Sequence, residues 1–291
     1  MARPRIVRLD GPVARLRAAL QAPGFRRESL QAGRWRMHHR VSLADPGDDA
    51  PAFVLVHGLI VSGRYMMPLA VRLAETHAVL VPDLPGFGGS ERPRRPLPVA
   101  GQAEALAGYL AAIGRPRVVL VANSFGCQVA ARAMAAGAGP VERLVLVGPT
   151  IDAAARGVPR QLVRLVASLP REPFEYPVLL VADLARVGLP RAVRAFRVAL
   201  ADRIEESLPQ VAVPTLVVRG SRDPIVPRRW GEEVAALLPD GRLAEVDGGG
   251  HALNYSRPDE LARLVRELAG RGVSPVAIDL TTERGLFDDA V

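Results

Sequence analysis

The chain has 291 residues, of which 49% are hydrophobic and 23% charged, with a formal net charge of +8. This length fits one large domain or two small ones, and the composition excludes a disordered or collagen-like chain. The single cysteine, Cys127, excludes an internal disulfide, and no apolar run is long enough for a membrane span or a secretory signal, so we expect a cytoplasmic protein without a membrane partner.

The first part of the chain has only weak patterns. Residues 1–32 are basic, with one short helix expected around residues 13–21, and we treat them as an N-terminal extension. Residues 33–43 alternate in polarity as an antiparallel strand does. Residues 44–51 have the Pro, Gly and Asp content of a turn.

From there on, strand and helix patterns alternate. Five wholly apolar runs have the composition of strands covered on both faces, at residues 53–56, 78–81, 118–121, 144–147 and 215–218. Helical patterns occur at residues 65–76, 99–113, 125–136, 228–238 and 258–269. This alternation predicts an α/β fold with a mostly parallel, twisted sheet and helices on both faces.

One stretch interrupts the alternation. Residues 149–211 are rich in Leu, Val, Ala and Arg, contain several prolines and lack a strand pattern, which predicts a helical cap inserted between two core strands. The core is then residues 33–148 and 212–270, and residues 271–291 form a C-terminal tail. The apolar cap residues that either line a pocket or pack the cap onto the core are Leu162, Leu165, Leu179, Leu180, Val181, Leu184 and Phe196.

The strongest signal for chemistry is the sequence VVLVANSFGCQVA at residues 118–130, an apolar strand that turns tightly into a helix. A strand–turn–helix of this kind exposes a nucleophile, here the hydroxyl of Ser124. The backbone N–H of Phe125 would stand at the helix N-terminus, where it can stabilise an oxyanion. The structural alternative is a serine that only caps an ordinary helix.

Two further loops follow apolar strands. In the sequence His57-Gly58-Leu59, the Leu59 N–H is the candidate for a second oxyanion donor. We interpret His57 as a structural residue that holds this loop rather than as a base. The sequence DLPGFGGS at residues 83–90 forms a tight turn without the lysine of a phosphate-binding loop, and we expect Asp83 to hold it.

An acid and a histidine complete the pattern. Asp223 lies in the sequence RGSRDPIVP just past a strand, and His251 ends the glycine-rich sequence EVDGGGH. Both would lie at the carboxyl edge of the sheet, where ligands bind in open α/β folds. The chain order Ser124, Asp223, His251 is the order of a nucleophile-elbow hydrolase. Asp152, near the end of an earlier strand, is the alternative acid.

Together these motifs resemble the α/β-hydrolase superfamily over residues 34–269. The resemblance implies the α/β-hydrolase fold with a helical cap, a Ser124-His251-Asp223 triad and an acyl-enzyme that water resolves, with no metal and no cofactor. His251 would move the proton of Ser124 to the leaving group while Asp223 orients the imidazole. Ala122 stands where many members have glycine, and this departure predicts modest strain at the turn.

The expected function is a serine hydrolase that cleaves a carboxylic ester, or a related acyl compound, of a small and largely apolar substrate. Asn123 is similar to the residue that precedes the serine in carbon–carbon bond hydrolases, so cleavage of a vinylogous diketo acid is the first alternative. Ala252, after His251, stands where those enzymes often carry tryptophan. A non-catalytic ligand-binding protein on the same scaffold is the second alternative.

Substrate contacts and partners are less specified. Arg64 is a candidate for meeting a substrate carboxylate, or else pairs with an acid, and Met66 is a pocket candidate or a core residue. All 38 basic residues are arginine, they are scattered, and only 4% of residues are aromatic. We therefore expect no nucleic-acid partner, only a small-molecule substrate, and a monomer or homodimer.

Overall fold

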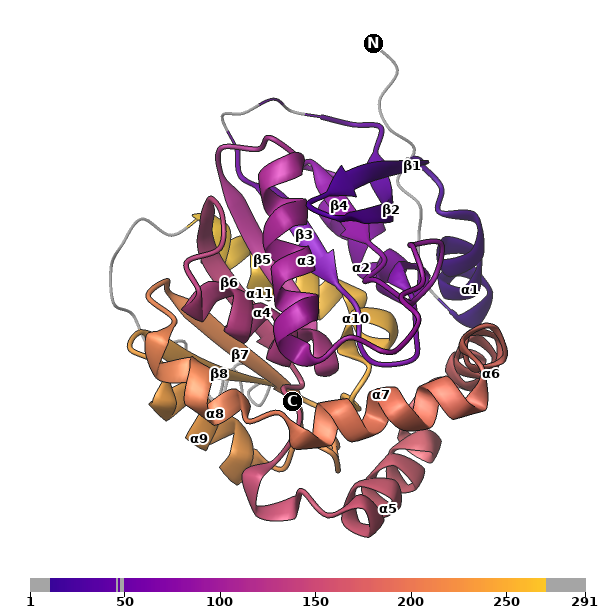
Figure 1. Ribbon diagram of the computed structural model, residues 1–291, viewed down its shortest axis with the longest axis vertical. Coiled ribbons are helices and arrows are strands. Elements are labelled where there is room, and N and C mark those ends of the chain that lie inside the picture. The colour runs from indigo at the N-terminus through magenta and orange to yellow at the C-terminus, as the bar shows by residue number, and fades with distance from the viewer. Residues whose placement is uncertain (1–10, 46, 48–49, 271–291) are drawn as a thin grey trace, which may run out of the picture.

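The computed structural model describes residues 11–45, 47 and 50–270, which are built around one eight-stranded sheet (Figure 1). The strand order is β1-β2-β4-β3-β5-β6-β7-β8. The strands are β1 (Phe25–Ala32), β2 (Trp35–Ser42), β3 (Ala52–Val56), β4 (Val79–Pro82), β5 (Val118–Asn123), β6 (Val141–Val147), β7 (Thr215–Gly220) and β8 (Gly241–Val246). Strand β2 pairs antiparallel with β1 and β4, and all other pairs are parallel, as the sequence predicts.

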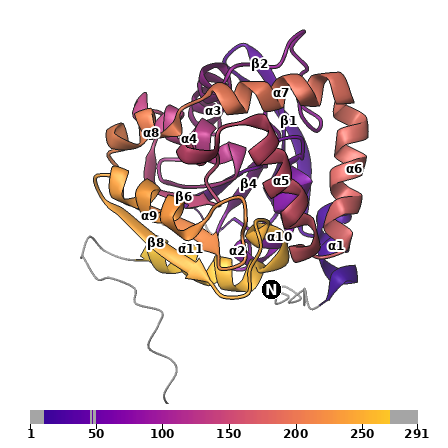
Figure 2. The ribbon, with the colours of Figure 1, turned by 90° about the horizontal axis from the view of Figure 1, so that it is seen from below.

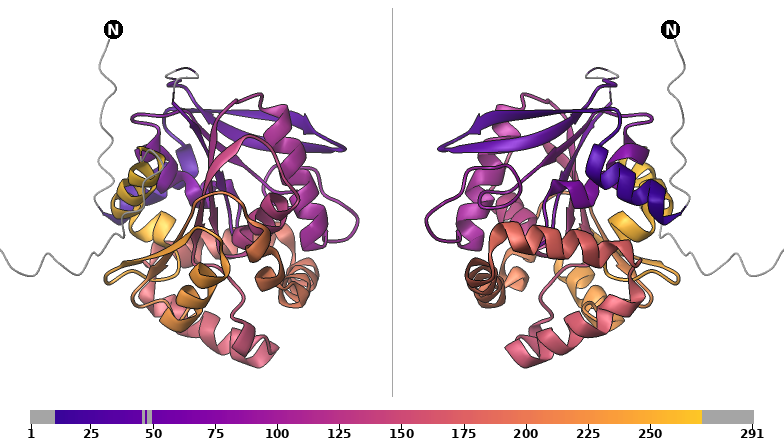
Figure 3. Two further views of the ribbon diagram at one scale, coloured as in Figure 1. Left: turned by 90° about the vertical axis from the view of Figure 1, so that its left-hand side faces the viewer. Right: turned by 90° about the vertical axis from the view of Figure 1, so that its right-hand side faces the viewer.

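Helices cover both faces of this sheet (Figure 3). The helices of the described residues, not all of which pack on the sheet, are α1 (Pro12–Gln21), α2 (Met67–Leu73), α3 (Val99–Ala112), α4 (Phe125–Ala135), α5 (Val158–Ser168), α6 (Glu175–Val187), α7 (Leu189–Ala201), α8 (Ile204–Ser207), α9 (Arg228–Leu237), α10 (Leu253–Ser256) and α11 (Pro258–Gly270). Short 3-10 helices are η1 (Gly63–Met66), η2 (Ala153–Ala155), η3 (Leu169–Arg171) and η4 (Leu208–Gln210).

The sheet separates two apolar cores, and strand β3 shows why. Its alternate residues point to opposite faces, so Val54 and Val56 join the core with α3, α4 and α9. Phe53 and Leu55 join the core with α1, α2 and α11. Because both faces are covered, the strand is apolar throughout, which is the pattern that the sequence shows.

Between β6 and β7 the chain leaves the sheet and forms helices α5 to α8, with η2, η3 and η4 between and after them. We call residues 149–211 the cap. No strand forms in these residues, as predicted. Figure 2 looks onto the cap, with α5, α6 and α7 around the region above the sheet's carboxyl edge.

The first strand differs from the prediction. Residues 25–32, assigned from the sequence to an N-terminal extension, form β1 and pair with β2 along their whole length. Only Ala32 of this strand is buried, because β1 lies at the sheet edge. An edge strand with exposed sides needs no apolar alternation, so the sequence FRRESLQA shows no strand pattern.

Two other expectations fall partly beyond the described residues. Residues 1–10 of the predicted extension and the whole predicted tail, residues 271–291, lie outside them. Within the described ranges, no helix combines the length and the apolar character that crossing a membrane requires.

Candidate active site

Ser124 sits in a strained turn between β5 and α4. Its backbone φ is +55°, a conformation that non-glycine residues seldom adopt. The Ser124 N–H donates to the Val147 carbonyl of β6 at 2.9 Å, and the Cys127 N–H donates to the Ser124 carbonyl at 2.9 Å. Its side chain makes no capping hydrogen bond to the helix. The hydroxyl is therefore not spent on capping, which disfavours the structural alternative.

Small residues allow this turn to form. Gly126 brings α4 against β3, since a Cβ at this position would lie 2.8 Å from the His57 carbonyl oxygen. Ala122 is fully buried and continues the regular pairing of β5, opposite Val56 and Leu146. The left-handed backbone conformation is thus at Ser124 and not at Ala122.

His251 and Asp223, from the loops after β8 and β7, are in contact. His251 Nδ1 lies 2.8 Å from Asp223 Oδ2. The other carboxylate oxygen accepts the N–H groups of Ile225 at 2.8 Å and Val226 at 3.2 Å, which fixes the carboxylate. Gly148 leaves room for the ring, because a Cβ there would lie 3.0 Å from His251 Cε1. The geometry therefore leaves Nε2 of the imidazole as the nitrogen free for chemistry.

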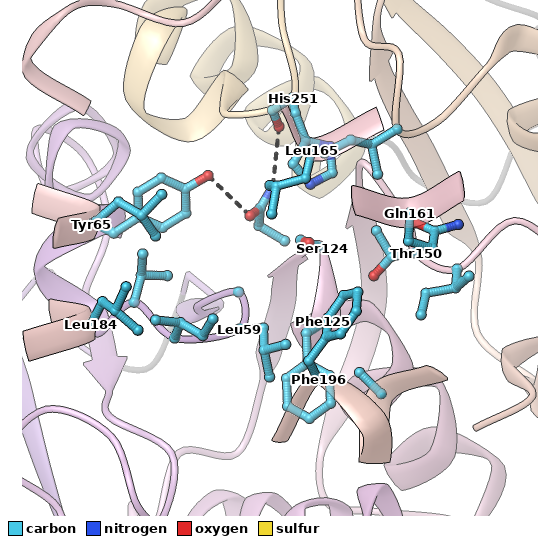
Figure 4. Close-up of a pocket in the computed structure, with 18 of the residues that line it drawn as sticks. Leu59, Tyr65, Ser124, Phe125, Thr150, Gln161, Leu165, Leu184, Phe196 and His251 are labelled. Carbon is cyan, nitrogen blue, oxygen red and sulfur yellow. Dashed lines mark hydrogen bonds between the residues drawn. The ribbon is translucent and has the colours of Figure 1, made fainter. Parts of the chain in front are cut away.

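Charge around His251 favours its protonated form. Burial by itself lowers the pKa of the imidazole, but the charge and hydrogen bond of Asp223, with the charge of Glu172, outweigh burial and raise the pKa above its usual value. Ser124 and His251 line the same cavity (Figure 4). No hydrogen bond joins these two side chains in the described structure, and such bonds often tighten only when substrate binds.

The alternative acid, Asp152, belongs to a different network. Its Oδ2 accepts from Arg164 at 2.8 Å and also pairs with Arg229, while Oδ1 accepts the Ala154 N–H at 3.0 Å. These two arginines occupy the carboxylate that the sequence left as a second candidate. The histidine contact belongs to Asp223 instead.

The two residues predicted to supply the oxyanion donors line the cavity. Leu59 and Phe125 both line it, one from the loop after β3 and the other from the first turn of α4. In the described part of the chain, neither backbone N–H donates to a protein acceptor. Ile60, next to Leu59, has a φ of +71°, so the loop turns sharply here. Two unpaired donors beside Ser124 suit a developing oxyanion.

His57 holds this loop and Asp83 holds the turn at residues 83–90, as expected from the sequence. His57 Nδ1 donates to the Gly58 carbonyl at 2.7 Å, and Nε2 accepts the Leu84 N–H at 2.9 Å. Burial lowers the pKa of the His57 imidazole and favours this neutral form. Asp83 Oδ2 accepts the Gly89 N–H of its own turn at 2.9 Å, and Oδ1 accepts the Gly63 N–H at 2.6 Å. Both ring nitrogens of His57 are engaged, so it is no base.

The cavity around Ser124 has a volume of about 220 Å³ and is mainly apolar (Figure 4). Of the candidate cap residues, those that line it are Leu165, Leu180, Leu184 and Phe196. Leu179 is buried in the core, whereas Leu162 and Val181 point to solvent. No Asp, Glu or Arg side chain is among the described lining residues.

The two predicted substrate contacts are not in the wall of this cavity. Arg64 is buried and its Nη2 lies 2.6 Å from Asp183 Oδ1 on α6, so its charge is already neutralised. Met66 is fully buried in the core beside α2. We correct the expectation for both: the ion-pair interpretation holds for Arg64 and the core interpretation for Met66.

Glu172 is a residue that the sequence analysis missed. It follows η3 in the cap, and its Oε1 accepts the backbone N–H groups of His251 and, at 3.0 Å, Ala252. Oε2 is buried without a partner among the described residues, and burial raises the pKa of the carboxyl. The cap thereby fixes the loop that carries the histidine. Nothing local in the sequence marks this contact, which spans 79 residues.

Glu172→Gln is expected to shift the pH dependence of hydrolysis to lower pH. The amide oxygen can still accept both N–H groups, but the negative charge that helps to raise the pKa of His251 is lost. Because the base acts when neutral, the rising limb of kcat/KM then begins at lower pH. The measurement is the pH profile of ester hydrolysis. Glu206→Gln, on the exposed side of the cap, is the control; superimposable profiles for Glu172→Gln and the wild type would contradict the charge effect.

Comparisons with known proteins agree with the fold. A model of the Alpha/beta hydrolase family matches residues 53–264, and the chain belongs to this family. Among the described residues, no group of His, Cys, Asp or Glu side chains is arranged to hold a metal ion.

Its relatives include hydrolases of two kinds. The chain is 30% identical to 2-hydroxymuconate semialdehyde hydrolase of Pseudomonas putida, covering 86% of this chain and 96% of that protein. It is 28% identical to pimeloyl-[acyl-carrier protein] methyl ester esterase of Xanthomonas campestris pv. campestris, covering 73% of this chain and 92% of that protein. The enol-lactonase structure from Burkholderia xenovorans LB400 superimposes with a TM-score of 0.68 at 21% identity, covering 84% of this chain and all of that one (100%). The first two relatives support a hydrolase, and the enol-lactonase structure shows the shared fold.

Proposed function

We propose that the protein is a serine esterase that hydrolyses a small, neutral carboxylic ester. The observation that carries this proposal is the cavity that holds Ser124 and His251: it is apolar and no Asp, Glu or Arg lines it among the described residues. The contact of His251 with Asp223 supports the triad, and the unused hydroxyl of Ser124 supports its role as nucleophile.

The reaction follows from this arrangement. His251 Nε2 takes the proton of Ser124 as Oγ bonds to the ester carbonyl carbon, and the oxyanion is held by the N–H groups of Leu59 and Phe125. The carbonyl re-forms, the C–O bond to the alcohol breaks, and the imidazolium gives its proton to the leaving alkoxide. Water then attacks the acyl-enzyme, with His251 again taking and returning a proton, and releases the acid. Asp223 keeps the ring oriented throughout.

Carbon–carbon bond hydrolysis of a diketo acid is the competing function. It is considered because the chain is similar to 2-hydroxymuconate semialdehyde hydrolase of Pseudomonas putida. Such a substrate carries a carboxylate, which is costly to bury without a cationic partner. Arg64, the residue that the sequence analysis considered for binding a substrate carboxylate, is paired with Asp183 and does not line the cavity. The apolar wall therefore favours a neutral ester over an anionic acid.

The size of the cavity is expected to limit the length of the acyl chain that the protein accepts. A cavity of about 220 Å³ is smaller than the pockets that hold drug-sized ligands, roughly 300–1,000 Å³. With p-nitrophenyl esters from acetate to decanoate, kcat/KM should peak at a short chain and fall toward decanoate. The hemisuccinate ester, which places a carboxylate in the cavity, should react at least about tenfold more slowly than butyrate, because its charge loses hydration without a partner.

The same assay separates the alternatives. A wild-type protein that ignores every ester but cleaves a ring-fission diketo acid would contradict the esterase proposal in favour of carbon–carbon cleavage. A protein that gives no turnover of either substrate, and no adduct with a serine-reactive phosphonate, would point to a ligand-binding role. Hemisuccinate hydrolysed as fast as butyrate would contradict the argument from the uncharged wall.

A further inference from the structure

Helix α5 presents its apolar side to solvent and its polar side to the protein. Gln161 and Ser168 are buried, whereas Val163 and Val166 are 69% and 66% exposed. Helices of water-soluble domains bury their apolar side, because that burial stabilises the fold. Helix α5 is reversed, and its buried Gln161 is satisfied by donating to the Ala155 carbonyl at 2.7 Å. The outward apolar side of α5 therefore has no partner among the residues that the structure describes.

Helix α6 and the loop before it also expose apolar side chains, although the inner side of α6 is apolar as well as acidic, with Leu179 buried and Leu184 in the cavity wall. Glu175 and Asp183 are buried, each paired with an arginine outside the cap. Val178 and Val181 are exposed, and Phe174 is 77% exposed. We call the outward side chains of these two segments the apolar cap face: Leu162, Val163, Val166, Phe174, Val178 and Val181.

The exposed apolar side chains are concentrated in the cap. Ten of the thirteen large hydrophobic side chains that are exposed in the described residues belong to it, although it is only about a fifth of the chain. Single exposed hydrophobic residues are normal on a protein surface, but a concentration of them on two consecutive helices is typical of an interaction site.

Charge near the apolar cap face is positive. Arg160 lies in the first turn of α5 and Arg171 ends η3, which follows α5. Both are exposed, and they donate to the carbonyls of Ala154 and Ala167 rather than to carboxylates. Most acids of the cap are buried. The exposed one, Glu206, lies in α8, on the side of the cap away from α6 (Figure 2). The face thus combines apolar side chains with unneutralised arginines.

We propose that the apolar cap face docks onto a lipid surface with anionic headgroups. Its valines and Phe174 would enter the boundary between headgroups and acyl chains, while Arg160 and Arg171 meet the negative charge. A second copy of this chain fits the face less well, because a two-fold contact would bring the same arginines together. We therefore propose a monomer in the absence of lipid.

Docking of this kind changes one expectation. The sequence analysis expected no membrane partner because the chain has no spanning segment, but docking at the surface requires none. Leu165 of α5 lines the cavity and is also partly exposed, so the docked side is the side that covers the active site. Entry of apolar esters from the lipid would rest on the proposed function; the docking itself does not.

The test is flotation of the full chain with vesicles. Wild type should float with vesicles of phosphatidylcholine mixed with phosphatidylglycerol, and much less with phosphatidylcholine alone or in high salt. The double variant Val163→Ser/Val166→Ser and the single variant Phe174→Ser should each bind the mixed vesicles more weakly, the double variant by at least about tenfold. Leu43→Ser, at a residue that is 62% exposed outside the cap, is the matched control and should bind as wild type does.

Three results would overturn the proposal. They are no flotation of wild type with the mixed vesicles, equal flotation of the cap variants and wild type, and equal binding to neutral and anionic vesicles. A dimer in light scattering that dissociates in the double variant would show that a second copy covers the face instead. Hydrolysis of a water-soluble ester should stay unchanged in all three variants, because none of the altered residues lines the cavity, and this activity separates loss of docking from loss of fold.

Discussion

Ser124→Ala is expected to reduce kcat for ester hydrolysis by at least about 10³-fold, because alanine has no oxygen to form the acyl-enzyme. The loss should leave binding intact. Alanine fits where serine does, and the serine hydroxyl makes no capping bond whose loss would release the helix. The measurements are kcat for p-nitrophenyl butyrate and the dissociation constant of a non-reactive ester analogue.

Cys127, one helical turn further on, provides the control. It is fully buried, and burial raises the pKa of its thiol far above the usual value, so it stays protonated and out of reach. Cys127→Ala should retain activity, and a serine-reactive phosphonate should label Ser124 in both Cys127→Ala and wild type. A Ser124→Ala variant that keeps more than about a tenth of the wild-type rate would contradict nucleophilic catalysis by this residue.

Asp223→Asn is expected to lower kcat by about 10³–10⁴-fold while the fold persists. The amide can present an N–H to Nδ1 where the carboxylate accepted from it, so the imidazole is held in the wrong tautomer and its cationic form loses a counter-charge. The measurement is kcat with the short-chain ester, alongside thermal unfolding.

Asp152→Asn is the matched comparison, since it makes the same chemical change at the other candidate acid. It should change kcat by less than about threefold and lower the unfolding temperature instead, because Arg164 and Arg229 lose their charged partner. A larger loss of kcat in Asp152→Asn than in Asp223→Asn would reverse the assignment of the acid.

The core sheet was predictable because burial on both faces leaves a simple mark. Strands such as β3 and β5 are apolar at every position except the last residue of β5, and the helices between them have their own period. The order of Ser124, Asp223 and His251 identified three loops at one sheet edge. The structure places the last two in contact, and Ser124 in the same cavity as His251.

The rest depends on contacts between distant residues. Strand β1 is polar because its sides are exposed, so it carries no strand pattern. Arg64 remained a candidate for binding substrate because the sequence does not reveal its ion-pair partner. That partner, Asp183, lies 119 residues further along the chain. The packing of the cap was the hardest part to predict. Helix α5 turns its apolar side toward solvent, whereas the hydrophobic pattern alone predicts that this side faces the core. Glu172 reaches the backbone of the His251 loop, and backbone contacts leave no trace in residue type.

The charged edge strands of the sheet influence how the protein aggregates when it is heated or concentrated. Outer strand β1 exposes Arg26, Arg27 and Glu28, and β8 at the other end carries Arg242 and Glu245. A second chain that added a strand at either end would have to accommodate these charges, which is how natural sheets resist edge-to-edge growth. This architecture therefore favours amorphous aggregation through the exposed valines of the cap over the growth of ordered fibrils.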